Sequence, residues 1–166
     1  MFIHGSRLYF LKLIFNVNSC AITNISKSRI RPFTVRYQKF EEELDSYDKQ
    51  VEQMQYCGDI EEVYRYQRRA QNLDNRLITA MEKIDKFNEE EVAFNWEITQ
   101  YPLRKRIADR LQPFKKLFDS ICEYLTKYDK WINSTIGTYN PEEIDNDVGT
   151  YYRSIRILKV LITQLY

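Results

Sequence analysis

Apolar side chains recur every three or four residues from about residue 34 almost to the end of this chain. That spacing places them along one face of an α-helix. No part of this body alternates apolar and polar residues as a half-buried strand does. With 166 residues, only four are glycine and four are proline, so few positions interrupt the pattern. The sequence therefore predicts an all-α fold, an elongated antiparallel array of four or five long helices.

The first two helices are expected over residues 34–55 and 60–87. Gly58 suits the left-handed residue that ends a helix. Asp59 suits the N-cap of the next helix, with Glu62 completing a capping box. At 1.5 Å per residue the second helix is roughly 40 Å long, which favours a coiled-coil-like antiparallel pair with the first. The apolar positions expected on the two seams are Val35, Phe40, Leu44, Tyr47, Val51 and Met54, and Ile60, Val63, Ala70, Leu73, Leu77, Met81, Ile84 and Phe87.

The remaining helices are bounded by prolines. Asn88 is expected to cap a third helix, with Glu91 at the reciprocal position, and this helix ends before Pro102. Pro102 starts the next turn, and Pro113 marks either a kink or a fresh start. The sequence 140–143, Asn-Pro-Glu-Glu, is the strongest helix start in the chain, with a cap, a proline and two acids in order.

Composition and motifs predict neither catalysis nor a cofactor. The glycines are too scattered to build a phosphate-binding loop, and a single histidine excludes a zinc site of the His–Cys type. Paired acids lie near expected helix starts, where the helix dipole favours them. The basic clusters 65–69 and 104–106 have acidic neighbours and are interpreted as solvated faces. We expect no enzyme activity, no metal and no bound cofactor.

Charge divides the chain unevenly. Residues 1–40 hold seven basic side chains and no acid, whereas the remaining residues hold 18 basic and 24 acidic side chains, a net charge of −6. A body with this balance is not expected to bind nucleic acid. The apolar run at residues 8–15 contains Lys12 and is too short to span a membrane.

Residues 1–33 allow three interpretations. A weak secretory signal and a mitochondrial presequence are two of them. The third, which we favour, is a segment foreign to the fold, such as a mispredicted first exon. On this interpretation the helical body is residues 34–166.

An ordered series of aromatics and prolines occupies residues 87–131. Packing within a helical core, or against another helix, is the expected role of these residues. They are Phe87, Phe94, Trp96, Tyr101, Pro102, Pro113, Phe114, Leu117, Phe118 and Trp131.

That series, continued by Asn140-Pro141-Glu142-Glu143-Ile144, Asp147-Val148 and Tyr152-Arg153, resembles the N-terminal part of the linker region of dynein heavy chains, with the axonemal type the closest fit. The resemblance covers about residues 37–160. It implies a mechanical element of a microtubule-based motor of cilia, near the junction with the tail. The implied partners are the dynein ATPase ring in cis, intermediate or light chains, and the microtubule indirectly.

The same resemblance implies a cytoskeletal, axonemal location and no ATPase site in this segment. Because both ends of the chain depart from the family pattern, we expect a truncated product. The alternative is a free-standing helical scaffold or adaptor of the coiled-coil or spectrin-like kind.

Overall fold

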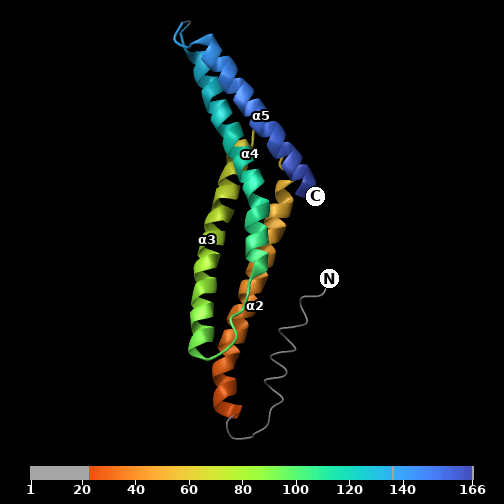
Figure 1. Ribbon diagram of the computed structural model, residues 1–166, viewed down its shortest axis with the longest axis vertical. Coiled ribbons are helices and arrows are strands. Elements are labelled where there is room, and N and C mark those ends of the chain that lie inside the picture. The colour runs from red at the N-terminus through yellow and green to blue at the C-terminus, as the bar shows by residue number, and fades with distance from the viewer. Residues whose placement is uncertain (1–22, 136, 166) are drawn as a thin grey trace. The chain divides into compact units, whose positions relative to one another are not determined.

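The computed structural model describes residues 23–135 and 137–165 and contains four helices in that part of the chain. They are α2 (Thr23–Met54), α3 (Val63–Ala93), α4 (Pro102–Asn133) and α5 (Pro141–Leu165), shown in Figure 1. The described ranges contain no strand. The predicted all-α class is therefore confirmed.

The chain divides into two compact units, Met1–Glu42 and Glu43–Tyr166. Helix α2 begins in the first unit, and the predicted boundary after residue 33 falls inside this helix. The interpretations offered for residues 1–22 lie outside the described residues. Within the first unit, Phe40 is buried as expected, but Val35 is 49% exposed. Five residues rotate a helix by about 140°, so the two side chains cannot share one face.

In the second unit, pairs of side chains that touch between helices give the direction of each helix. Gln67 bonds Asp119 at 2.8 Å, whereas Lys115, earlier on α4, contacts Asp74, later on α3. Residue numbers that rise on α3 while they fall on α4 mean that these neighbouring helices are antiparallel (Figure 1).

Helices α4 and α5 form a second antiparallel pair, in which Lys127 Nζ lies 2.7 Å from Asp147 and the rings of Tyr124 and Tyr151 meet edge to face. The end of α2 runs parallel to α4, since Arg106 reaches Asp48 and Arg110 reaches both Asp48 and Glu52.

The core of the second unit lies along one stripe of each of α2, α3 and α4. On α3 the stripe differs from the prediction at two places. Met81 is 44% exposed and Ala80 is buried instead, while Ile60 precedes the helix and is exposed. A small side chain at residue 80 permits close approach of a neighbouring helix. The buried apolar residues of the unit are Leu44, Tyr47, Val51, Met54, Val63, Ala70, Leu73, Leu77, Ala80, Ile84, Phe87, Ile107, Leu111, Phe114, Phe118, Cys122 and Leu158.

The predicted glycine end of the first helix is wrong. Helix α2 stops at Met54, and the next three amides bond three residues back in tight turns, as Cys57 N–H does to the Met54 carbonyl at 3.1 Å. These bonds satisfy terminal carbonyls without a left-handed residue. Gly58 accordingly lacks a positive φ, in contrast to Gly137, whose φ is 93°.

The predicted capping box at Asp59 is also wrong. The Asp59 carboxylate accepts the Glu61 N–H at 2.9 Å, which makes a local turn ahead of the helix. Helix α3 begins only at Val63, and its N-cap residue Glu62 makes no side-chain capping bond. Glu62 pairs with Arg65 at 3.0 Å instead.

The helix start predicted for α5 is confirmed. Asn140 accepts the Glu142 N–H on its side-chain oxygen at 3.0 Å, and Pro141 is the first helical residue. Glu142 and Glu143 occupy the first turn, where they complement the partial positive charge of the helix N-terminus.

Candidate functional site

The connection between α3 and α4 begins with a turn at Asn95. Asn95 has φ 54°, the left-handed conformation that a small polar side chain tolerates. Its N–H bonds the Val92 carbonyl at 3.0 Å, and the Trp96 N–H bonds the Glu91 carbonyl at 2.8 Å. This pair of bonds is a Schellman motif, which ends α3 and reverses the chain.

A buried carboxylate holds the far side of the same turn. Glu91 is 3% exposed, and Thr99 donates to it twice, from its backbone N–H at 2.6 Å and from its hydroxyl at 2.6 Å. A charge in this position is stabilised because its hydrogen bonds replace those of water. The turn is thereby fixed at both ends, by Asn95 and by the Glu91–Thr99 pair.

This geometry corrects the predicted third helix. Asn88 lies inside α3 and does not cap a new helix, and Glu91 bonds Thr99 rather than the residue 88 backbone. The segment 94–101 is not helical. The sequence around residues 94 and 96 is compatible both with another turn of helix and with a Schellman turn. Either structure places the polar and aromatic side chains of this segment close together, so the sequence could not distinguish the two.

The aromatic residues of the predicted series take different positions around the turn. The rings of Phe94 and Trp96 stack with centroids 5.1 Å apart, yet Phe94 is 47% exposed and Trp96 is half-buried. Phe87 is buried, and its ring centroid lies 6.5 Å from that of Tyr101 at the entry to α4. Phe87 therefore packs in the core, whereas Phe94 is largely a surface residue.

Helix α4 carries the central members of the series. Pro102 is its first residue, and the helix continues through Pro113 to Asn133 without a break. Proline at position 113 has no N–H to donate to the carbonyl four residues earlier. Phe114 and Phe118 are buried, with ring centroids 6.4 Å apart, and Leu117 is half-buried beside them.

The last member of the series lies near the loop that joins α4 to α5. Trp131 is half-buried, and its ring meets that of Tyr124 edge to face at 6.4 Å. Tyr124 in turn contacts Tyr151 of α5. The hydrogen bond to Asp147 raises the pKa of Lys127, whose ammonium also lies 5.3 Å from the Tyr151 ring.

Ion pairs between helices were not predicted from the sequence. Asp48 of α2 lies 2.6 Å from Arg110 and 3.6 Å from Arg106, both of α4, and Asp74 of α3 lies 2.5 Å from Lys115 of α4. In each pair the charged residues lie next to an apolar stripe. This position is the only sign of the ion pairs that the sequence gives. The partner of each charge depends on how the helices are aligned, and periodicity does not fix that alignment.

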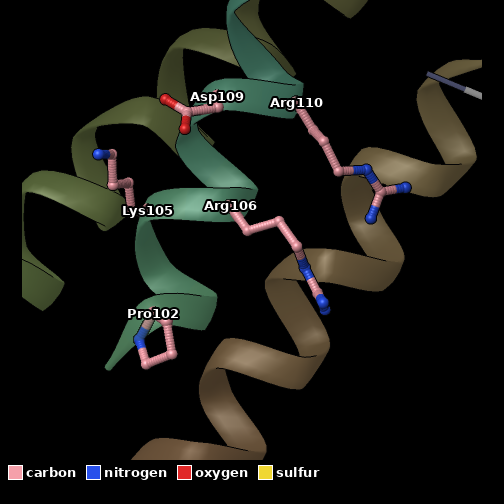
Figure 2. Close-up of a pocket in the computed structure, with 5 residues that line it drawn as sticks. All are labelled: Pro102, Lys105, Arg106, Asp109 and Arg110. Carbon is pink, nitrogen blue, oxygen red and sulfur yellow. The ribbon is translucent and has the colours of Figure 1, made fainter. Parts of the chain in front are cut away.

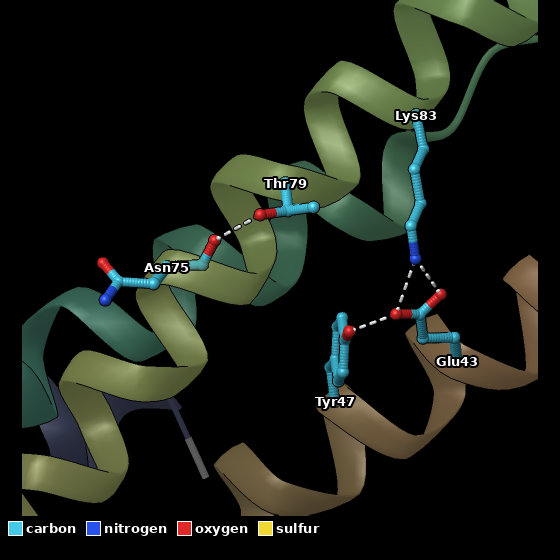
Figure 3. A network of polar contacts seen from close by, with 5 residues as sticks. All are labelled: Glu43, Tyr47, Asn75, Thr79 and Lys83. Carbon is cyan, nitrogen blue, oxygen red and sulfur yellow. Dashed lines mark hydrogen bonds and ion pairs between the residues drawn. The ribbon is translucent and has the colours of Figure 1, made fainter.

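A further polar network joins α2 to α3 (Figure 3). Lys83 donates to both oxygens of Glu43, at 2.9 and 2.7 Å, and the Tyr47 hydroxyl donates to the same carboxylate. Burial raises the pKa of Tyr47 to about 12, with a further contribution from the hydrogen bond to Glu43. Burial alone would raise the pKa of Glu43, but the hydrogen bonds from Lys83 and Tyr47 outweigh it and lower the value.

A surface depression of about 400 Å³ is lined by one face of α4 (Figure 2). Arg106 and Arg110 extend from α4 toward α2, where they meet Asp48, and Lys105 and Asp109 point away from it. Arg104 also has an intramolecular role, since its Nε donates to the Leu77 carbonyl at 3.1 Å. Within the basic cluster 104–106, Lys105 and Arg106 are exposed, as predicted for a solvated face, and Arg104 is half-buried.

None of these groups forms a reactive constellation. Burial raises the pKa of the thiols of Cys57 and Cys122, so both are protonated at neutral pH. Within residues 23–135 and 137–165 there is no cluster of three or more side chains suited to a metal ion. Over those same ranges, no helix has both the length and the apolar character needed to cross a bilayer.

Comparison with known proteins shows which proteins this chain resembles in sequence. The chain is 24% identical over 153 residues to human dynein axonemal heavy chain 12, a match that covers 92% of this chain. It is 25% identical over 130 residues to mouse dynein axonemal heavy chain 3, covering 76% of this chain. The chain is similar to axonemal dynein heavy chains.

The similarity to axonemal dynein heavy chains involves a small part of those proteins. This chain spans 5% of the length of the human heavy chain 12 and 3% of the mouse heavy chain 3. Because the longer match takes in 153 of 166 residues, part of the segment 1–33 lies within it. No protein-family model matches the chain, and no solved structure matches it significantly.

Proposed function

We propose that this chain is a segment of the linker of an axonemal dynein heavy chain, a mechanical element that carries no ATPase site of its own. The observation that carries the proposal is the similarity to two axonemal heavy chains over 76–92% of this chain. The motor activity of such proteins would lie in other regions of the heavy chain, and this segment would be a mechanical element for those regions. Its place of action would be the axoneme, with the microtubule as an indirect partner.

The contacts between helices support a mechanical role. An element that transmits force must resist sliding of its helices past one another. Asp48 with Arg106 and Arg110, Asp74 with Lys115, and Glu43 with Lys83 each join two helices at fixed positions along their length. A slide of α3 by one helical turn, about 5.4 Å, would break both the Glu43–Lys83 pair and the Asp74–Lys115 pair.

The fixed turn between α3 and α4 supports the same role. Glu91, Thr99 and Asn95 hold residues 94–101 in one conformation. A connection of this kind passes a displacement of α3 on to α4 instead of absorbing it.

A chimeric motor tests the proposal. The matched segment of human dynein axonemal heavy chain 12 is replaced by residues 43–160 of this chain, and microtubule gliding and ATP hydrolysis are measured. We expect gliding to be retained, and we expect it to slow when the chimera also carries Asp48→Asn and Asp74→Asn, while ATP hydrolysis continues. A chimera that hydrolyses ATP but never moves microtubules would contradict the proposal.

The second candidate is a free-standing helical scaffold. It is favoured by the core that this short chain buries by itself. An antibody against residues 100–130 distinguishes the two on an immunoblot of ciliated tissue. A band at the 20.2 kDa of this chain favours the scaffold, and a band of heavy-chain size favours the motor.

A further inference from the structure

The second half of α5 carries an apolar stripe on the side turned away from α4. Leu158 is buried, and Tyr151 contacts Tyr124 of α4, so this side of α5 faces the bundle. Ile157 and Val160 lie on the other side and are 61% and 52% exposed, and Leu161, at the edge between the two sides, is 44% exposed. Their spacing of three and four residues makes one continuous ridge on the helix surface.

The charges beside this stripe are all of one sign. Arg153, Arg156 and Lys159 are exposed on α5, and no acidic side chain follows Asp147 in the sequence. Arg153 donates to the Thr150 hydroxyl at 3.2 Å within its own helix. Within the described part of the chain, none of the three forms an ion pair with a carboxylate. Elsewhere in the second unit, half-buried cations meet acids across helices, as Lys127 and Asp147 do.

From this combination we propose that the outward face of α5, defined by Arg153, Arg156, Ile157 and Val160, is the docking surface for an acidic amphipathic helix. The partner would lay its apolar side on Ile157 and Val160. Its Asp or Glu side chains would pair with Arg153 and Arg156.

Charge complementarity selects this occupant over a second copy of the same face. Two copies of α5 packed through this stripe would bring Arg153 and Arg156 of both copies together, and like charges across an interface oppose association. An acidic helix turns the same charges into attractions. It also reproduces the contact that α5 already makes with α4, where an apolar seam is flanked by a Lys–Asp pair.

A binding measurement with synthetic helices tests the proposal on the full chain. The probe is a labelled 21-residue peptide with leucines at helical spacing and glutamates on both flanks. The matched control peptide has the same leucines and lysine in place of every glutamate. By fluorescence anisotropy at low salt, we expect the glutamate peptide to bind at least about tenfold more tightly than the lysine peptide.

Charge reversal locates the binding on this face. We expect the double variant Arg153→Glu with Arg156→Glu to lose the glutamate peptide and to gain the lysine peptide. A chain that had unfolded would bind neither, so the exchange of preference separates a lost surface from a lost fold. The control variant Arg68→Glu with Lys86→Glu changes exposed cations of α3 and should leave both affinities within about twofold.

Three results would overturn the proposal. One is equal binding of the two peptides. Another is self-association of the chain in sedimentation velocity that Val160→Ser abolishes, without binding of either peptide. The third is binding to vesicles of phosphatidylserine, lost on charge reversal, with no binding of the glutamate peptide.

Discussion

Phe114 shows how much depends on single side chains in the middle of α4. It is 2% exposed and stacks on Phe118, so its removal leaves a cavity that the two flanking helices cannot fill. We expect Phe114→Ala to lower the free energy of unfolding by about 3–5 kcal/mol. Urea denaturation measures the change.

Phe94→Ala is the matched control for this substitution, because Phe94 is 47% exposed and lies on the turn surface. It should cost less than about 1 kcal/mol. Similar losses for the two variants would mean that Phe94 packs as deeply as Phe114.

Glu43 makes the stability of the α2–α3 pair depend on pH. Its folded pKa is lower than the ordinary value of 4.5, because bonds from Lys83 and Tyr47 outweigh the effect of burial. A lowered carboxyl pKa contributes stability that is present above 4.5 and is lost as pH falls through the folded value. We expect Glu43→Gln to be less stable than the parent at about pH 7, by less than about 1 kcal/mol because the pair is partly exposed.

That difference should shrink as the pH falls below 4.5 and through the lowered folded pKa, because the parent carboxylate then becomes protonated. Thermal unfolding midpoints of both chains across this range provide the measurement. A difference that stays constant with pH would show that the Glu43–Lys83 bond does not contribute through charge.

At the scale of the helices, the conformation of one residue controls the reversal between α3 and α4. Asn95 holds φ 54°, which glycine adopts without strain and a β-branched residue adopts only at a cost. We expect Asn95→Gly to be neutral or to stabilise slightly, and Asn95→Val to destabilise by about 1–2 kcal/mol. Calorimetric midpoints of the two variants decide this, and equal midpoints would contradict the left-handed turn.

The parallel contact of α2 with α4 depends on Asp48. Since two arginines converge on this half-buried carboxylate, Asp48→Asn removes charge from both pairs at once. The expected loss is about 1–3 kcal/mol. Asp45→Asn, an exposed neighbour one turn away on the same helix, should stay within about 0.5 kcal/mol. Equal effects of the two substitutions would argue against a specific role for Asp48.

Across the whole second unit, burial falls off toward α5. Helix α3 has eight buried residues and α4 has five, whereas the buried side chain described on α5 is Leu158. Because local opening is easiest where few apolar contacts are lost, α5 should open before the other helices. Native-state hydrogen exchange should show lower protection for amides in α5 than for those in the middle of α3 and α4. Uniform protection along all helices would contradict this order.

The sequence determined the helices of this protein, because the spacing of apolar residues and the chemistry of helix ends act locally. Buried Leu73, Leu77, Leu111 and Phe114, and the start of α5 at Asn140-Pro141, follow from such local rules. The family resemblance was also readable in the sequence, since it rests on the order of residues.

Tertiary structure decided how the chain turns between helices and which charges meet. Whether Glu91 would cap a helix or receive Thr99 depended on where α4 could dock, and so did the left-handed Asn95. The pairing of Asp48 with Arg110 depended on the alignment of helices distant in sequence. The physical reason is that periodicity fixes which face of a helix is apolar, but it fixes neither the axial position nor the partner of that face.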